Sequence, residues 1–268
     1  MAVDSNGDIA LPIVNAMQPE FARVVDGVVA TLTRCFPELM HSLYVYGSVA
    51  QGRATPDKSD LDMSVIFHDR SDRATAARLA EIKRELEKSY PVVSKIDFDC
   101  GVLPQVLHPD HTLSWGYWLK HHCVCVYGKD LSRRFAPFKP AKAIAVAVNG
   151  DFLPVLEKFM AQIRSSADKN EGLQLQRAAA RKIIRATSIL RSEYDKDWPD
   201  TLAEHHGKLI ARYPEKADDM DYLLAVSHEP RGDLADFEKR ILAFARWLNV
   251  EFHRRQSLAE KRPGLMLC

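Results

Sequence analysis

The pattern of apolar residues changes once along this chain of 268 residues, at the proline-containing segment 135–140. Before that segment, stretches that alternate with period two are interleaved with stretches of helical period, whereas every later stretch has helical period. A chain of this length accommodates two hydrophobic cores. The change predicts an α+β domain over residues 1–136 and an all-α helical bundle domain over residues 141–256, followed by a flexible tail over residues 257–268.

The first half is predicted to run helix, strand, strand, helix, strand, helix, strand after a loose leader over residues 1–12. Residues 42–46 are strand formers, and residues 61–67 alternate apolar with polar side chains. Residues 73–89 have the two faces of an amphipathic helix. The other predicted elements with bounds are a helix over 13–36 and strands over 92–103 and 123–127.

The second half has no convincing strand pattern. Its predicted helices cover residues 141–166, 173–194, 202–213, 217–226 and 234–252. In the last of these, Leu234, Phe237, Ile241, Phe244 and Leu248 form one apolar stripe, which is typical of a helix packed on a core.

Composition narrows the class of partner. The formal net charge is +1, with 46% hydrophobic and 27% charged residues, which disfavours nucleic acid as a partner. No apolar run reaches membrane-spanning length, and the first residues lack a secretory signal pattern. The odd number of scattered cysteines (five) indicates reduced thiols and a cytoplasmic protein.

One stretch carries the chemistry: a predicted strand runs into Gly47-Ser48, Gly52 follows, and the next strand opens with Asp60-Leu-Asp62. Glycines permit tight turns and close approach to a phosphate. Ser48 and the backbone N–H groups of a short helix can donate to a triphosphate. Asp60 and Asp62 share one strand face and suit Mg²⁺, which takes oxygen ligands. Alone, each half of the motif is usually a turn or a solvated strand face.

A third carboxylate is expected on the strand over 92–103. Asp97 and Asp99 alternate there with apolar residues and therefore share a face. Such carboxylates are costly in a buried strand unless a cation or hydrogen bonds compensate. The alternative is an exposed edge with two solvated aspartates. Asp97 is the favoured catalytic residue, and Asp99 stays open as the alternative.

The combined motif resembles the Gly-Ser … Asp-X-Asp signature of the DNA polymerase β-like nucleotidyltransferases, and in particular its minimal nucleotidyltransferase variant. The matching residues are Gly47, Ser48, Ala50, Gly52, Ser59, Asp60 and Asp62. The resemblance implies a mixed sheet with helices, two Mg²⁺ ions bound by Asp60 and Asp62, and Asp97 as general base or metal ligand. It also implies that Ser48 and Ser59 lie on the nucleotide phosphates.

The helical second half is similar to that of the aminoglycoside adenylyltransferases. Residues 110–131 resemble a bridging segment of that group, and residues 174–185 its ATP-facing helix, where Arg181 would contact the triphosphate. The alternative for Arg181 is an ordinary solvated helix face. The third carboxylate of that group is often Glu, whereas this chain has Asp.

These features predict an enzyme that moves AMP from ATP, with Mg²⁺, to a hydroxyl of a small-molecule acceptor such as an aminoglycoside. Two alternatives remain: an antitoxin-type enzyme that adenylylates protein or RNA, and a non-catalytic nucleotide-binding module. The acceptor, the nucleotide preference and the oligomeric state are left open by the sequence.

Two further clusters have structural interpretations as well as functional ones. His121-His-Cys123-Val-Cys125 lacks the spacing of a zinc site, so the cysteines are expected to be core thiols. Asp195, Asp197 and Asp200 either attract a cationic acceptor or precede a capped helix.

Overall fold

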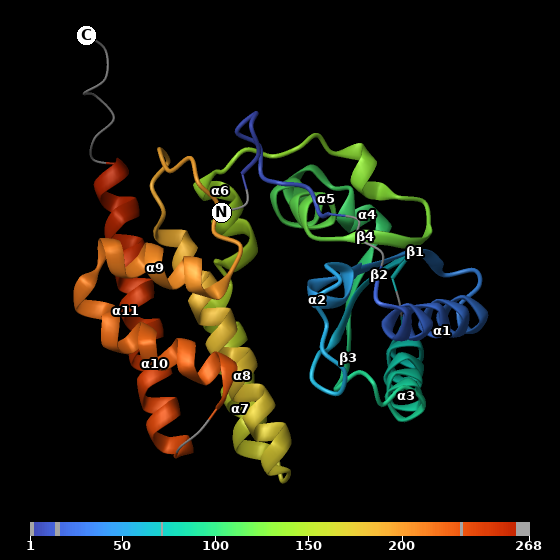
Figure 1. Ribbon diagram of the computed structural model, residues 1–268. Helices are drawn as coiled ribbons and strands as arrows, with labels where there is room; N and C mark the ends of the chain where they lie inside the picture. Colours follow the sequence, from blue (N-terminus) through green and yellow to red (C-terminus); the bar gives the residue numbers. More distant parts are fainter. Residues whose placement is uncertain (1–2, 14–16, 71, 231–232, 261–268) are drawn as a thin grey trace. The chain divides into compact units, whose positions relative to one another are not determined.

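The computed structural model describes residues 3–13, 17–70, 72–230 and 233–260 (Figure 1). The chain forms two compact units, one of residues 8–138 and one of residues 139–268 together with residues 1–7. The division falls inside the proline-containing segment 135–140, between Phe138 and Lys139. The leader was expected to be loose, but Ile9 is fixed in the fold. Its side chain is buried, and its N–H donates to the carbonyl of Phe138 at 2.8 Å.

The first unit, residues 8–138, is built on a mixed four-stranded sheet with strand order β3-β2-β1-β4. β1 (Met40–Tyr46) is antiparallel to β2 (Leu61–Phe67) and to β4 (Val124–Gly128), while β3 (Ile96–Val102) is parallel to β2. The helices α1 (Pro19–Cys35) and α3 (Arg73–Ser89) precede β1 and β3. This mixed sheet confirms the predicted fold class of the first unit.

The two faces of the sheet are covered differently (Figure 1). On one face, side chains such as Leu43, Val45 and Met63 form a core with α1 and α3. On the other face, Tyr44 and Ile66 pack with short helical segments. These segments are α4 (Leu103–Val106), η2 (Thr112–Gly116), α5 (Tyr117–His121) and η3 (Leu131–Arg134), and η1 (Pro109–His111) lies between α4 and η2 in the chain.

Two predicted boundaries and one predicted helix in this unit differ from the structure. The first helix begins at Pro19 rather than residue 13, and residues 14–16 lie outside the described part of the chain. The third strand begins at Ile96 rather than residue 92, because the buried Val93 packs into the core from a turn. Residues 103–121 form several short helical turns instead of one helix.

The second unit is helical in its described residues and has a separate core with Leu156, Ile183, Phe237 and Phe244 among its members. Its helices are α6 (Lys142–Asn149), α7 (Phe152–Ser165), α8 (Lys169–Ala186), η4 (Thr187–Leu190), α9 (Leu202–Arg212), η5 (Pro214–Lys216), α10 (Ala217–His228) and α11 (Leu234–Glu260). The expected helix over 141–166 is broken at Gly150. α11 takes in residues 257–260 of the expected tail, and residues 261–268 lie outside the described part.

The described helices include none that is long and apolar enough to cross a membrane.

Candidate active site

The end of β1 and the start of β2 bring Gly47 against Asp62. Tyr46, the last residue of β1, pairs with Asp62 in the antiparallel register, and Gly47 follows with φ +72°. A Cβ atom at Gly47 would lie 2.6 Å from Asp62 Oδ2. Both the backbone angle and the close carboxylate therefore require glycine at this position. The fold therefore brings the Gly-Ser turn against the Asp-X-Asp strand.

Asp60 lies one residue before β2 and is held by a residue that the motif does not contain. The hydroxyl of Ser94 donates to Asp60 Oδ1 at 2.5 Å, and the N–H of Ser94 donates to the carbonyl of Ser59 at 3.0 Å. Ser59 Oγ accepts the N–H of Thr55 at 2.8 Å, so its side chain closes the turn before β2. Ser94, in the segment before β3, thus holds the Ser59-Asp60 part of the motif.

The third-strand aspartates lie beside β2. In the parallel register, Asp97 pairs with Asp62 and Asp99 pairs with Ser64. Since Ile66 packs on the face away from α1 and α3, Asp62 and Ser64 also point there, as do their partners on β3. The structure therefore places Asp62 and Asp97 next to each other and Asp99 farther along the same face.

Tyr46 connects these carboxylates electrostatically. Burial raises the pKa of its phenol, and the nearby carboxylates of Asp62, Asp99 and Asp97 raise it further. Asp99 keeps exposed surface, yet the surrounding protein removes enough water to raise the pKa of its carboxyl. The Trp118 ring meets Tyr46 edge-on, with ring centres 4.9 Å apart. The carboxylates thus lie near the aromatic ring of Tyr46, which packs against Trp118.

The side chain of Trp118 is itself fixed over this face. Its Nε1–H donates to Ser64 Oγ at 3.3 Å, and its ring stacks on His122 with centres 4.7 Å apart. His122 Nε2 in turn lies 2.6 Å from the hydroxyl of Tyr117. The bridging segment expected over residues 110–131 therefore supports the carboxylate face of the sheet.

The donor set at this face fits Mg²⁺ by its chemistry. Asp60, Asp62 and Asp97 offer carboxylate oxygens only, which are the ligands that Mg²⁺ takes together with substrate phosphates. Among the residues that the structure describes, no three His, Cys, Asp or Glu side chains already form a metal-ligand group. Mg²⁺ commonly completes its shell with substrate phosphates and water, so a few carboxylates that do not by themselves enclose an ion agree with this donor set.

The remaining nucleotide-binding candidates, Ser48 and Arg181, belong to different units of the chain. Ser48 is half-buried in the short helix α2 (Gly47–Ala50), next to the Gly47 turn. Arg181 lies on α8 in the helical unit, where its Nε–H donates to the carbonyl of Ser227 at 3.2 Å. Arg177 likewise donates to the carbonyl of His228 at 2.8 Å. These two arginines therefore cap the C-terminal end of α10, a structural role that their helical spacing did not reveal.

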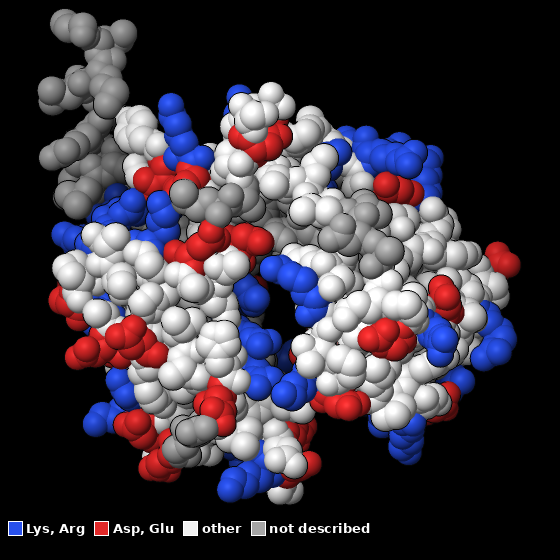
Figure 2. Space-filling view, in the orientation of Figure 1, with Lys and Arg blue, Asp and Glu red and all other residues white. Residues whose placement is uncertain are grey.

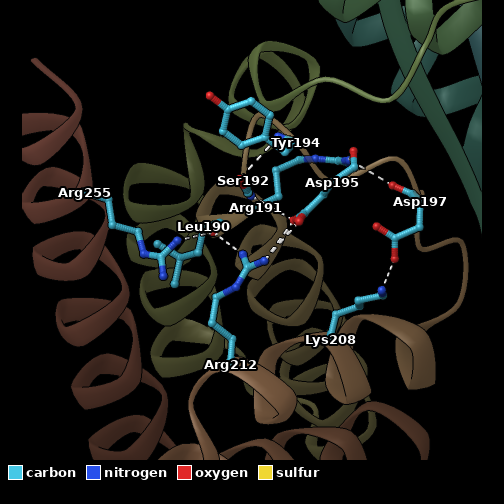
Figure 3. Close-up of polar contacts among 9 residues, drawn as sticks. All are labelled: Leu190, Arg191, Ser192, Tyr194, Asp195, Asp197, Lys208, Arg212 and Arg255. Atoms are coloured by element: carbon cyan, nitrogen blue, oxygen red, sulfur yellow. Dashed lines mark hydrogen bonds and ion pairs between the residues drawn. The ribbon is translucent and has the colours of Figure 1, made fainter. Parts of the chain in front are cut away.

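The acidic run after α8 is matched by basic side chains (Figure 3). Asp195 forms an ion pair with Arg212 at 3.0 Å, and Asp197 forms one with Lys208. Arg191 donates to the carbonyls of Asp195 and Asp197 at 2.6 and 2.8 Å and thereby folds the loop around itself. The loop residues thus have structural partners within the helical unit.

The two cysteines of the His121–Cys125 segment were expected to be core thiols, and Cys123 is buried whereas Cys125 is half-buried. His121 Nδ1 lies 3.1 Å from the carbonyl of Ala10, and its Nε2 accepts the N–H of Phe138 at 3.0 Å. Cys123 is buried, with its sulfur 3.9 Å from Ser64 Oγ. Both ring nitrogens of His121 are therefore occupied by the backbone.

Sequence reasoning missed Ser94, Tyr46 and the two lysines that contact Asp97. Lys83 Nζ lies 3.1 Å from Asp97 Oδ1, and Lys95 Nζ lies 2.6 Å from Asp97 Oδ2. Lys95 directly precedes β3, and its i, i+2 spacing from Asp97 was a usable signal, because residues two apart in an extended segment share a face. Lys83 belongs to α3 and had no local signal.

The surface charge agrees with the composition. On the face shown in Figure 2, Lys and Arg side chains are interspersed with Asp and Glu on both units.

Comparison with known proteins identifies the kind of domain that contains these residues. Residues 34–101, which include Gly47 and all four aspartates of the site, match the family described as nucleotidyltransferase domain. The fold is similar to the crystal structure of spectinomycin adenyltransferase AAD(9) from Enterococcus faecialis with ATP and spectinomycin. The match has a TM-score of 0.55 at 14% identity and covers 87% of this chain and 99% of that chain. No curated protein matches the sequence significantly. The chain therefore contains a nucleotidyltransferase domain, within a fold similar to that of an adenyltransferase.

Proposed function

We propose that the protein is a Mg²⁺-dependent adenylyltransferase that transfers AMP from ATP to a hydroxyl of a small-molecule acceptor. The observation that carries the proposal is the pairing of Asp62 with Asp97 beside the Gly47 turn, with Asp60 held by Ser94. Carboxylates gathered on one sheet face next to a glycine turn are the arrangement that metal-assisted phosphoryl transfer requires.

In this reaction the acceptor hydroxyl oxygen attacks the α-phosphorus of ATP, the bond to the pyrophosphate oxygen breaks, and pyrophosphate leaves. Asp60 and Asp62, together with Asp97, would hold Mg²⁺, which when bound would neutralise charge on the triphosphate. Asp97 takes the hydroxyl proton. Ser48, Ser59 and Arg181 are proposed contacts of the nucleotide phosphates, although Ser59 and Arg181 also have the structural partners described above.

Asp97 is the better candidate for the third carboxylate because it is the register neighbour of Asp62. Asp99 lies two residues farther along β3 and pairs with Ser64. Asp97→Asn is expected to remove more of the transfer rate than Asp99→Asn. An equal or larger loss in Asp99→Asn would reverse the assignment.

A small-molecule acceptor is favoured over protein or RNA. The protein of similar fold was crystallised with ATP and spectinomycin, and the match covers 99% of that chain. The net charge of +1 provides no general attraction for nucleic acid. Aminoglycosides and related polyhydroxylated amines are therefore the first acceptors to test.

The test uses α-labelled ATP and Mg²⁺ with a panel of aminoglycosides and spectinomycin. Labelled small molecule is the expected product, whereas label on protein or RNA would support the alternative acceptors. Asp60→Asn and Asp62→Asn are expected to abolish transfer and to keep the fold. Asp26→Asn, an exposed position on α1, is the matched control. Full activity in both Asp60→Asn and Asp62→Asn would contradict the proposal, and ATP binding without transfer to any acceptor would indicate a binding module.

A further inference from the structure

The carboxylate of Asp97 is engaged on both oxygens by lysines. Lys83 contacts Oδ1 at 3.1 Å and Lys95 contacts Oδ2 at 2.6 Å. The side chains of the two lysines are 28% and 38% exposed, so their charges are partly shielded from water. Two ammonium groups therefore occupy the carboxylate that the proposed reaction needs as a metal ligand or base.

Both lysines are carried by backbone that is held in place. Glu87, one turn after Lys83 on α3, accepts the N–H of Ile96 at 2.9 Å and ties the helix to the outer edge of β3. Lys83 Nζ also lies 3.9 Å from Glu87 Oε1. The carbonyl of Lys95 accepts the N–H of Leu61 at 2.9 Å. The lysines thus reach Asp97 from fixed backbone positions, and each contacts a different carboxylate oxygen.

A metal ion and an ammonium group compete for the same carboxylate lone pairs, because each ligand oxygen must turn toward one cation or the other. Their positive charges also repel when both lie beside one carboxylate. We propose that Lys83 and Lys95 form a two-lysine clamp that competes with the divalent cation for Asp97 and so sets the metal affinity of the site. This inference rests on the proposed function, since it takes Asp97 as part of the metal site.

The clamp makes the two lysines positioning residues that act through Asp97. Removing one lysine leaves Asp97 with fewer competing cations and strengthens metal binding. For partly exposed ion pairs the effect per lysine is about two- to fivefold in the dissociation constant. The gain should shrink at high salt, because salt screens pairs near the surface.

The test measures binding of Mn²⁺ alone, by electron paramagnetic resonance of the free ion, to the full-length chain. Lys83→Met keeps the length of the side chain and removes its charge, and Lys95→Met does the same on the other side. Both are expected to bind Mn²⁺ about two- to fivefold more tightly than the natural protein. Lys83→Arg is expected to restore the natural affinity. Lys88→Met, an exposed position on the same helix, is the matched control for the loss of one positive charge.

An unchanged affinity in Lys83→Met and Lys95→Met, or an equal gain in Lys88→Met, would overturn the clamp. A gain in Lys83→Met that disappears when Asp97→Asn is also present would confirm that the lysines act through Asp97. The proposed function is tested separately by transfer from labelled ATP. If the natural protein transfers AMP but the lysine variants bind Mn²⁺ with unchanged affinity, only the clamp is contradicted. If the natural protein shows neither transfer nor Mn²⁺ binding, the proposed function is contradicted.

Discussion

Substitution of Gly47 by alanine tests whether the space beside Asp62 matters for the site. At φ +72° an alanine costs about 1–2 kcal/mol in backbone conformation. Its Cβ atom would also lie 2.6 Å from Asp62 Oδ2, a separation that real Cβ atoms essentially never show. Because that atom is the end of the Asp62 side chain, the carboxylate can turn away, so we expect the free energy of unfolding to fall by about 1–2 kcal/mol, mainly from backbone conformation.

The functional effect is expected to exceed the effect on stability. To relieve the contact, either the Asp62 carboxylate or the Gly47 turn must move by several tenths of an ångström, and misplacement on the scale of 1 Å costs about a hundredfold in rate. We therefore expect transfer from ATP to fall by about ten- to a hundredfold in Gly47→Ala. The assays are urea denaturation for stability and release of pyrophosphate for the transfer rate.

The matched control is Gly7→Ala. Gly7 also has positive φ, at +79°, but a Cβ atom there has nothing within 4 Å. Gly7→Ala should therefore carry only the conformational cost and leave the transfer rate unchanged. If Gly47→Ala kept the natural transfer rate and Mn²⁺ affinity, the argument that glycine is needed to make room for the Asp62 carboxylate would be refuted.

Three further predictions concern polar contacts. Ser94→Ala removes the hydrogen bond to Asp60 and should lower the free energy of unfolding by about 0.5–1.5 kcal/mol and the transfer rate severalfold, measured by urea denaturation and pyrophosphate release. Burial lowers the pKa of His205 from 6.5 to about 3, so its stabilising effect is complete above pH 6.5 and is lost as the pH falls toward 3. Urea midpoints of His205→Gln between pH 7 and 4 should therefore depend less on pH than those of the natural protein. Hydrogen bonds, first from Arg254, lower the pKa of Glu251 from 4.5 to about 2, so its contribution is complete above pH 4.5 and is lost toward pH 2. Glu251→Gln should destabilise the protein at pH 7, and the difference in urea midpoint should shrink as the pH falls below 4.5.

The sequence predicted the fold class because its evidence was local. Period-two alternation over residues 61–67 and helical periodicity over residues 73–89 each describe one element, and both agree with the structure. The break between α6 and α7 also had a local signal, since Gly150 stands where the helix stops and Phe152 begins the next one. The error there came from giving apolar periodicity more weight than a glycine.

The errors near the site have long-range causes. Val93 is a strand former, but its side chain is buried in the core from a turn, so strand propensity alone misplaced the start of β3. Ile9 is fixed by Phe138, which lies far away in the sequence. Arg181 donates to Ser227 across two helices, a contact that spacing along α8 does not encode. Each of these contacts depends on tertiary packing.

The site and the core of the first unit arise from the same alternation. Along β2, Leu61, Met63 and Val65 enter the core with α1 and α3, and this fixes Asp62 and Ser64 on the opposite face. A slip of one residue would bury Asp62 in that core, at the high cost of an uncompensated buried carboxylate. The apolar residues therefore enforce the register, and the register places Asp62 beside Asp97 and Gly47. It follows that substitutions which weaken the alternation of β2 should damage the carboxylate arrangement even when they lie on the face away from it.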